Sequence, residues 1–259
     1  MLNSKKILII YQPWRKFSEG LHQPMIENLK KLGLKVEFLE VENPPKFQNK
    51  NWADKLKNIY HRIVKKDKTY IYVAEKNHYN RFNLEKLKLF KNQKFDFILI
   101  IKPDEFTPKF IKKASELGEI TAGYIWDGIR HFFLESLHKS RKYFKYLYSF
   151  DQNDIKKFPE LKMDFLTNYY VFDENRENYN AKELDLYYIG ALGGKLPEQR
   201  RDLLLEKLLK NFTGKTEVKI HLEKNFLLNE DEKLKNPKIE YIYNYVTYQE
   251  AMEKTKSSK

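Results

Sequence analysis

Residues 95–101 read Phe-Asp-Phe-Ile-Leu-Ile-Ile and form the clearest apolar run of the chain. A run of this length that is apolar except for Asp96 is typical of a parallel strand that is covered on both faces. Thr107 and Pro108 then have the chemistry of a helix N-cap and first helical residue, and that helix pattern ends before Gly118. A second apolar run follows at residues 120–125. This order of strand, helix and strand predicts a parallel α/β sheet.

The same alternation extends through the first two thirds of the chain. Gly33 follows a helical pattern at the C-cap position, whereas residues 70–73 fit either a strand or the start of a helix. About five strands predict one doubly wound, Rossmann-like domain over residues 1–170. Its other expected elements are strands at 6–11, 35–41, 146–150 and 163–166, and helices at 17–32, 52–65 and 152–157.

A polar stretch at residues 171–184 predicts a linker, after which the alternation of strands and helices starts again. The second set has about three strands, and the chain ends at Lys259 after a helical pattern, where a further strand would be expected. We therefore expect an incomplete second Rossmann-like domain at residues 185–259. Its expected strands are 186–189, 217–222 and 239–243, and its expected helices are 197–212 and 247–255.

The composition excludes several classes of protein and of site. Aromatic residues make up 15%, which argues against disorder, and the absence of Cys excludes disulfides and thiol chemistry. No signal peptide or membrane-spanning stretch is recognisable, and the six His show no metal-binding spacing. We expect a cytoplasmic protein, with peripheral binding to the inner face of the membrane left open. The net charge of +13 fits either a Lys-rich surface or attraction to an anion.

The stretch GYIWDGIR at residues 123–130 is the most distinctive candidate site. It ends a predicted strand, and open α/β sheets bind ligands outside the carboxyl ends of their strands. Asp127 and Arg130 therefore stand where a base, an anion clamp or a contact to a sugar hydroxyl would act. An equal alternative is that Asp127 caps the next helix while Trp126 packs in the core.

Three other polar residues raise similar alternatives. Asp151, in YSFDQND, is either a site carboxylate or a helix N-cap, and Asp154 is expected to complement the helix dipole. The pair lacks the Asp-x-Asp spacing of metal-dependent sugar transferases, so no metal is implied. His22 follows the first predicted strand and would act as a base or hydroxyl contact, although a lone His is more often structural.

The turn GALGGK at residues 190–195 follows a predicted strand and precedes a helix that carries Arg200. Small residues let backbone N–H groups approach a phosphate, and the helix N-terminus adds favourable charge. Lys195 would reach a diphosphate and Arg200 would support it bidentately. The spacing matches neither G-x-G-x-x-G nor a Walker A loop, so an ordinary βα turn is the alternative. The phosphate-binding candidates within the turn are Gly190, Gly193, Gly194 and Lys195.

Three stretches taken in order, GYIWDGIRHF, YLYSFDQNDIKKF and DLYYIGALGGKLPEQRRDLLLEKL, span residues 120–210. They resemble bacterial GT-B glycosyltransferases of the spore-maturation (CgeB-like) and lipopolysaccharide or capsular polysaccharide biosynthesis type. The resemblance implies two Rossmann-like domains, with the acceptor mostly on the first and a nucleotide-sugar donor mostly on the second. It also implies transfer without a metal or other cofactor, with Asp127 as first polar candidate and with Gly190 and Lys195 near the diphosphate.

Such enzymes continue beyond YQEAMEKTKSSK, the end of this chain, with a segment that grips the nucleotide's ribose and base. The leading interpretation is a glycosyltransferase that acts on a surface-polysaccharide, lipopolysaccharide or lipid-linked acceptor, with Asp127 and His22 as catalytic candidates. The alternative is a non-catalytic nucleotide-fold scaffold, which the early end of the chain favours. Nucleic-acid binding ranks last, because the charge is accompanied by no recognition motif.

Overall fold

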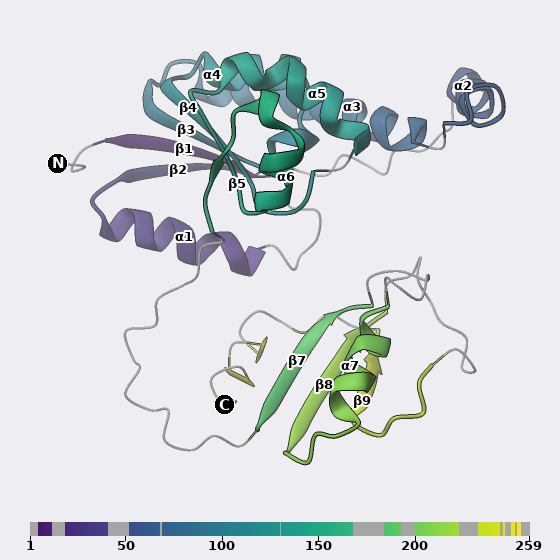
Figure 1. The fold of residues 1–259 in the computed structure, drawn as a ribbon. Helices are drawn as coiled ribbons and strands as arrows, with labels where there is room; N and C mark the ends of the chain where they lie inside the picture. Colours follow the sequence, from purple (N-terminus) through teal and green to yellow (C-terminus); the bar gives the residue numbers. More distant parts are fainter. Residues whose placement is uncertain are drawn as a thin grey trace. The chain divides into compact units, whose positions relative to one another are not determined.

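The computed structural model describes residues 5–11, 19–40, 52–67, 69–129, 131–167, 184–192, 200–222, 233–243, 246, 250–251 and 253–254. By its internal contacts the chain divides into two compact units, Met1–Val171 and Phe172–Lys259. Each unit is described by itself, and Figure 1 labels most of the helices and strands of both. The linker predicted at 171–184 lies outside the described residues except for Leu184.

The first unit is built on one parallel sheet with the order β2-β1-β3-β4-β5-β6 in its described residues. These strands are β1 (Lys6–Tyr11), β2 (Lys35–Glu40), β3 (Phe95–Ile101), β4 (Gly118–Ile125), β5 (Tyr146–Ser149) and β6 (Asp164–Phe165). The α-helices are α1 (Glu19–Lys31), α2 (Trp52–Ile63), α3 (Tyr70–Leu84), α4 (Pro108–Ser115), α5 (His131–Ser140) and α6 (Gln152–Lys157). Short 3-10 helices lie at η2 (Lys86–Phe90), η3 (Pro103–Glu105), η4 (Arg141–Tyr143) and η5 (Pro159–Leu161).

Alternate residues of the central strands point into two separate hydrophobic cores. Leu8 and Ile98 join the core that Phe110 of α4 completes, whereas Ile9 joins the core that Ile26 of α1 completes. Figure 1 shows α1 on one face of the sheet and α3, α4 and α5 on the other. The unit is therefore a three-layer α/β/α arrangement, as the sequence predicts.

The expectation for residues 95–101 is confirmed, because β3 pairs with β1 on one side and with β4 on the other. Residues 70–73, which fitted a strand or a helix, form the first turn of α3. Gly33 has a φ of 88°, the left-handed conformation that a helix C-cap glycine supplies.

One detail of the first sheet differs from the expectation. The six strands in the described residues lie at the six ranges expected from the sequence, but β4 begins at Gly118 instead of residue 120. Gly118 pairs with Phe95 of β3, and a Cβ atom at Gly118 would lie 2.6 Å from Cγ1 of Ile98. The glycine that indicated the end of a helix is thus also the residue that lets β4 start close against β3.

The second unit has a parallel sheet with the order β7-β8-β9 in its described residues. Its elements are β7 (Leu186–Ala191), α7 (Arg201–Leu209), β8 (Thr216–His221) and β9 (Ile239–Ile242). Leu205 and Leu209 of α7 pack with Val218 and Ile220 of β8 into one core. The start of the helix predicted at 197–212 and most of the one predicted at 247–255 lie outside the described residues. Among the described helices of both units, none combines the length and the apolar character that crossing a membrane requires.

Candidate functional site

The carboxyl ends of the strands in the first sheet are where an open α/β sheet binds its ligand. Strand β1 lies between β2 and β3, so the strand order changes direction between β1 and β3. Ligands of doubly wound sheets bind at this switch point. The residue that follows β3 there is Lys102, and the residues that follow the neighbouring β4 are Trp126 and Asp127.

Lys102 is the centre of a charged cluster at this edge. Its side chain is 6% exposed, and its Nζ lies 3.2 Å from Oδ2 of Asp127, 3.7 Å from Oε1 of Glu105 and 3.9 Å from Oδ2 of Asp104. Its φ of 56° is left-handed, a conformation that costs a non-glycine residue of order 1–2 kcal/mol. Three carboxylates around one ammonium group compensate for the cost of burying its charge. We call Lys102, Asp104, Glu105 and Asp127 the Lys102 cluster.

Helix α3 brings a second buried lysine to the same region. Nζ of Lys76 donates to the carbonyl oxygen of Asp104 at 3.4 Å and lies 4.5 Å from the ring centroid of Phe133. Burial lowers the pKa of Lys76 to about 8, although the charges of Asp104 and Glu105 oppose this shift. Asn80, one helical turn further, donates to the carbonyl of Glu105 at 3.1 Å. Helix α3 therefore fixes the backbone of the loop that carries the Lys102 cluster.

The low pKa of Lys76 predicts how stability depends on pH. Below about pH 8 the lysine is protonated in both states, so the full penalty of burial applies. Between this value and the ordinary pKa of 10.5, the unfolded state binds a proton that the folded state lacks, so the free energy of unfolding rises with pH. Relative to Lys76→Met, the wild-type protein should gain about 2 kcal/mol between pH 8 and pH 10, as measured by urea denaturation.

Lys91→Met is the control for this experiment, since Lys91 is exposed. Its stability relative to wild type should stay constant over the same pH interval. If the stability difference between wild type and Lys91→Met changed with pH as much as that between wild type and Lys76→Met, the burial of Lys76 would not be the cause of the effect.

Asp127 combines exposure to solvent with a fixed orientation. Its side chain is 58% exposed, and its Oδ1 accepts from the backbone N–H of Gly128 at 2.8 Å. Its Oδ2 faces Lys102, and helix α5 begins four residues further on, at His131. The hydrogen bonds shown for Asp127 are therefore not those of a helix cap. Asp127 is thus an exposed carboxylate in contact with the buried cation of Lys102. Such a carboxylate can accept a hydrogen bond, or a proton, from a hydroxyl group of a ligand.

The neighbours of Asp127 have structural contacts. Trp126 is half-buried and lies edge-on to Tyr11 at the end of β1, with ring centroids 5.3 Å apart. Asp151 is the N-cap of α6, because its Oδ1 accepts from the N–H of Asn153 at 2.8 Å. Asp154, at the third position of α6, accepts from the N–H of Ile129 at 2.8 Å and so ties α6 to the loop after β4.

The other candidates in the first unit are less fully described. His22 belongs to helix α1, but its side chain lies outside the described part of the chain. Arg130 lies outside it entirely, as do Gly193, Gly194 and Lys195 of the second unit. Of the sequence candidates in the first unit, the structure therefore places Trp126 and Asp127 at one edge and Asp151 at the end of the adjacent β5.

In the second unit the described candidates are Gly190 and Arg200. Gly190 lies near the end of β7, where a Cβ atom would meet the hydroxyl of Tyr188 at 2.5 Å. Arg200 is the N-cap residue of α7, and its Nε donates to Oδ1 of Asp202 at 3.0 Å. Asp202 is fully buried and also accepts from the hydroxyl of Tyr241 at 2.7 Å.

This network changes the interpretation of Arg200. Burial opposes the ionisation of Asp202, but hydrogen bonds from Arg200 and Tyr241 outweigh it and keep the pKa of Asp202 below its usual value. Burial, together with the Asp202 carboxylate, raises the pKa of Tyr241 to about 12. Two of the guanidinium nitrogens of Arg200 bond to Asp202, which fixes the start of α7 against β9. The bidentate contact predicted for a diphosphate is thus made to a carboxylate of the protein.

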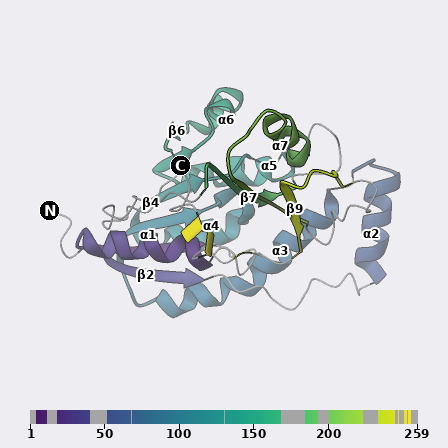
Figure 2. The ribbon, with the colours of Figure 1, turned by 90° about the horizontal axis from the view of Figure 1, so that it is seen from below.

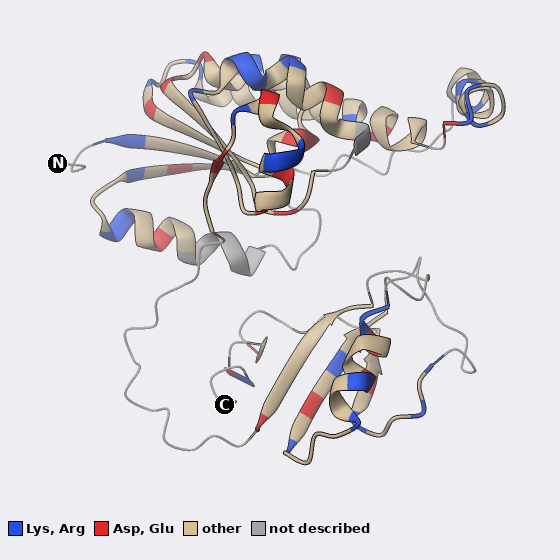
Figure 3. Cartoon of the chain, viewed as in Figure 1, with Lys and Arg blue, Asp and Glu red and all other residues tan. Residues whose placement is uncertain are grey.

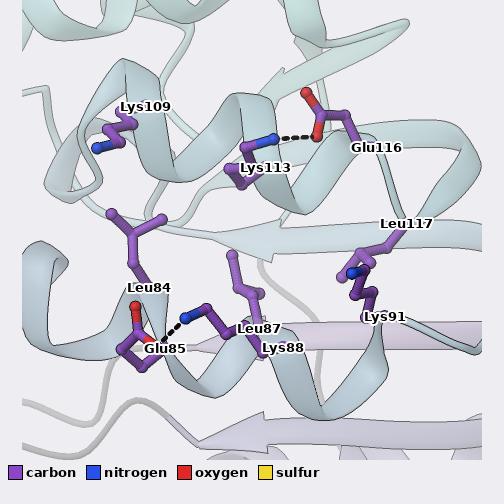
Figure 4. Close-up of a pocket in the computed structure, with 9 residues that line it drawn as sticks. All are labelled: Leu84, Glu85, Leu87, Lys88, Lys91, Lys109, Lys113, Glu116 and Leu117. Carbon is purple, nitrogen blue, oxygen red and sulfur yellow. Dashed lines mark hydrogen bonds and ion pairs between the residues drawn. The ribbon is translucent and has the colours of Figure 1, made fainter.

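A hollow of about 500 Å³ lies elsewhere in the first unit, between η2 and α4 (Figure 4). Leu84, Leu87 and Leu117 form apolar parts of its lining. Its rim carries two ion pairs, from Lys88 to Glu85 and from Lys113 to Glu116. The lining also includes Lys91 and Lys109, and it contains none of the candidates predicted from the sequence. The ion pairs are exposed, and such pairs contribute little to binding or stability.

Sequence reasoning missed Lys76, Lys102, Asp104 and Glu105. The signal for three of them was the run KPDE, which directly follows the clearest strand of the chain. Charged residues at the carboxyl end of a buried strand are candidates on the same argument that singled out Asp127. In the described part of the chain, no group of three or more His, Asp or Glu is arranged to hold a metal ion.

The chain is similar in fold to solved glycosyltransferase structures. An alpha-glucosyltransferase in complex with UDP and a 13-mer DNA containing a HMU base superposes with a TM-score of 0.50 at 13% identity, covering 99% of this chain and 71% of that one. An alpha-glucosyltransferase in complex with UDP and a 13-mer DNA containing a central A:G mismatch gives a TM-score of 0.45 at 14% identity, covering 98% and 70%, a likeness too weak to add to the argument.

No family model and no curated protein matches the chain. The conclusion from these comparisons concerns the fold alone: the chain has two parallel α/β units and a GT-B-like fold, the fold class that the sequence predicts.

Proposed function

We propose that the protein is a GT-B glycosyltransferase that moves a sugar from a nucleotide-diphosphate sugar to an acceptor hydroxyl group. The observation that carries the proposal is Asp127, an exposed carboxylate at the carboxyl end of β4 that the buried Lys102 holds in place. It lies at the edge of the sheet where a doubly wound fold binds its ligands. The similarity to a glucosyltransferase in complex with UDP supports the same activity.

In the proposed reaction, Asp127 accepts the proton of the acceptor hydroxyl. The acceptor oxygen forms a bond to the anomeric carbon of the donor sugar, and the bond from that carbon to the diphosphate oxygen breaks. The nucleoside diphosphate leaves with the electron pair of this bond. If the transfer inverts the anomeric carbon, this step is general-base catalysis, to which the base contributes typically about 10²–10⁴-fold in rate.

The leaving diphosphate is assigned to the turn at residues 190–195, as the resemblance implies. Backbone N–H groups and Lys195 would stabilise its charge in place of a metal ion. Since Arg200 bonds to Asp202, we propose that it supports this site indirectly, by fixing the start of α7. A metal-independent reaction is part of the proposal.

For the acceptor we propose a surface polysaccharide, lipopolysaccharide or related lipid-linked glycan. The support is the resemblance over residues 120–210 and the net charge of +13, which favours an anionic membrane surface. We assign the protein to the cytoplasm and to the inner face of the membrane on the same grounds.

DNA is the second candidate acceptor, although nucleic-acid binding ranks last among the functions considered from the sequence. The alpha-glucosyltransferase of similar fold is in complex with DNA, and a charge of +13 would attract phosphates. Glucosylation of a duplex by the purified protein, with no transfer to glycan acceptors, would favour this candidate over the first.

Nucleotide binding is the first test of the proposal. A nucleoside diphosphate such as UDP, or the matching nucleotide sugar, should raise the thermal unfolding temperature and give a saturable calorimetric signal. At about 100 times the dissociation constant, a ligand stabilises its protein by about 2.7 kcal/mol. Absence of a response to every nucleotide would contradict the proposal. Binding without transfer to any acceptor would favour the non-catalytic scaffold instead.

A further inference from the structure

Helix α2 carries an apolar stripe that faces solvent. Trp52, Leu56, Ile59 and Ile63 follow one another at intervals of four, three and four residues, which places them on one face of the helix. Their exposed fractions are 74%, 47%, 51% and 71%. Tyr60, on the same side, is 50% exposed. Figures 1 and 2 both show α2 at the periphery of its unit, away from the sheet.

The polar side of α2 is the side attached to the protein. The ring of His61 stacks on Tyr70 of α3 at a centroid distance of 4.3 Å, and Nδ1 of His61 lies 3.3 Å from Oδ2 of Asp67. Among the described side chains of α2, those that are half-buried are Asn58 and His61. A surface helix normally turns its apolar face to the core. Here that orientation is reversed, so the fold of this unit gains nothing from the stripe.

Basic residues border the stripe on both sides. With 100° between successive residues, Lys55 and Arg62 lie along one border and Lys57 along the other. Lys65 and Lys66 follow the helix directly, and Figure 3 shows the basic residues of α2 in blue. Residues 52–66 contain five Lys or Arg and a single acidic residue, which gives a formal charge of +4.

We propose that α2 is a membrane-docking helix that lies in the surface of an anionic bilayer, with its stripe among the acyl chains and its basic residues at the headgroups. A cationic amphipathic helix with Trp, Leu and Ile on one face has the chemistry for this position. At 12 residues, α2 is too short to span a bilayer, which takes about 20. The long stems of its lysines can follow the stripe while their charges reach the phosphates.

Other partners fit this surface less well. A second copy of the chain would bring two helices of charge +4 together, a costly like-charge contact. Nucleic acid would neutralise the lysines through its phosphates but would leave the apolar stripe exposed to water. An anionic lipid surface satisfies both the stripe and the charges.

This inference rests on the proposed function only for the reason why the protein would meet a membrane, namely a lipid-linked or surface acceptor. The binding itself needs neither donor nor transfer. Vesicle binding and nucleotide binding are therefore measured separately, and each can fail while the other succeeds.

The test is sedimentation of the whole chain with vesicles of phosphatidylcholine alone or mixed equally with phosphatidylglycerol. The protein should bind the mixed vesicles, with an affinity that falls as salt is added, and should bind pure phosphatidylcholine much more weakly. The double substitution Ile59→Gln and Ile63→Gln should weaken binding at least about tenfold. Because both side chains are exposed, the variant should unfold at the wild-type temperature.

A matched control exchanges Leu204→Gln and Leu208→Gln on α7, which are 69% and 56% exposed and have the same spacing of four residues. This control should bind vesicles like the wild type. Equal losses for both double variants, or no binding of wild type to the mixed vesicles, would overturn the proposal. A wild-type dimer that the α2 substitutions dissociate, with vesicle binding unchanged, would assign the stripe to a second copy and overturn it as well.

Discussion

Asp127→Asn is expected to lower the rate of sugar transfer by about 10²–10⁴-fold, because an amide cannot take the proton of the acceptor hydroxyl. The variant should stay folded, since the side chain is 58% exposed and an amide oxygen can still accept from the N–H of Gly128. Lys102 keeps two carboxylates, Asp104 and Glu105, within 4 Å. The measurement is release of nucleoside diphosphate from a nucleotide sugar in the presence of acceptor, with thermal unfolding measured in parallel.

Asp164→Asn serves as the matched control, since Asp164 is an exposed carboxylate on β6 of the same unit. It should transfer sugar at the wild-type rate. The affinity of Asp127→Asn for the nucleoside diphosphate alone should match that of the wild type, because the proposal assigns the diphosphate to the second unit. Transfer by Asp127→Asn at the rate of Asp164→Asn would remove Asp127 from the catalytic role and leave His22 as the remaining candidate base.

The positions of the strands could be predicted from the sequence because the apolar runs are short and well separated. The run at 95–101 is the central β3, and Asp127 follows a strand as its position in GYIWDGIR indicates. Register and exact ends were less predictable. Gly118 has the signature of a helix end, yet its close approach to Ile98 makes it the first residue of β4.

The partners of the charged residues could not be predicted from sequence spacing. Arg200 precedes a helix as a phosphate-binding arginine would, but Tyr241, which completes its network with Asp202, lies 39 residues beyond Asp202. Which face of α2 points toward the protein could not be predicted from the sequence either. Its periodicity predicts a helix at 52–65, but the rule that an apolar stripe faces the core gives the wrong side, because His61 fastens the polar face to Tyr70.

The contacts of the Lys102 cluster could not be predicted from the sequence either. They lead to the second prediction with a large expected effect. In the sequence, KPDE is a charged loop that would be assigned to solvent, whereas in the fold Asp104 is 0% and Glu105 2% exposed. Lys102→Met removes a cation from these buried carboxylates. Breaking a buried ion pair from one side costs about 3–5 kcal/mol, because the remaining charge is left uncompensated. We expect the free energy of unfolding, measured with urea at pH 7, to fall by this amount.

The comparison that isolates burial is Lys113→Met, which breaks the exposed pair with Glu116 on α4. Exposed pairs contribute about 1 kcal/mol or less, so this variant should be nearly as stable as the wild type. Adding Asp104→Asn and Glu105→Gln to Lys102→Met should recover part of the loss, because neutral side chains need no cation. Equal, small losses for Lys102→Met and Lys113→Met would mean that water or Lys76 compensates the carboxylates, and that Lys102 does not hold Asp127 in place.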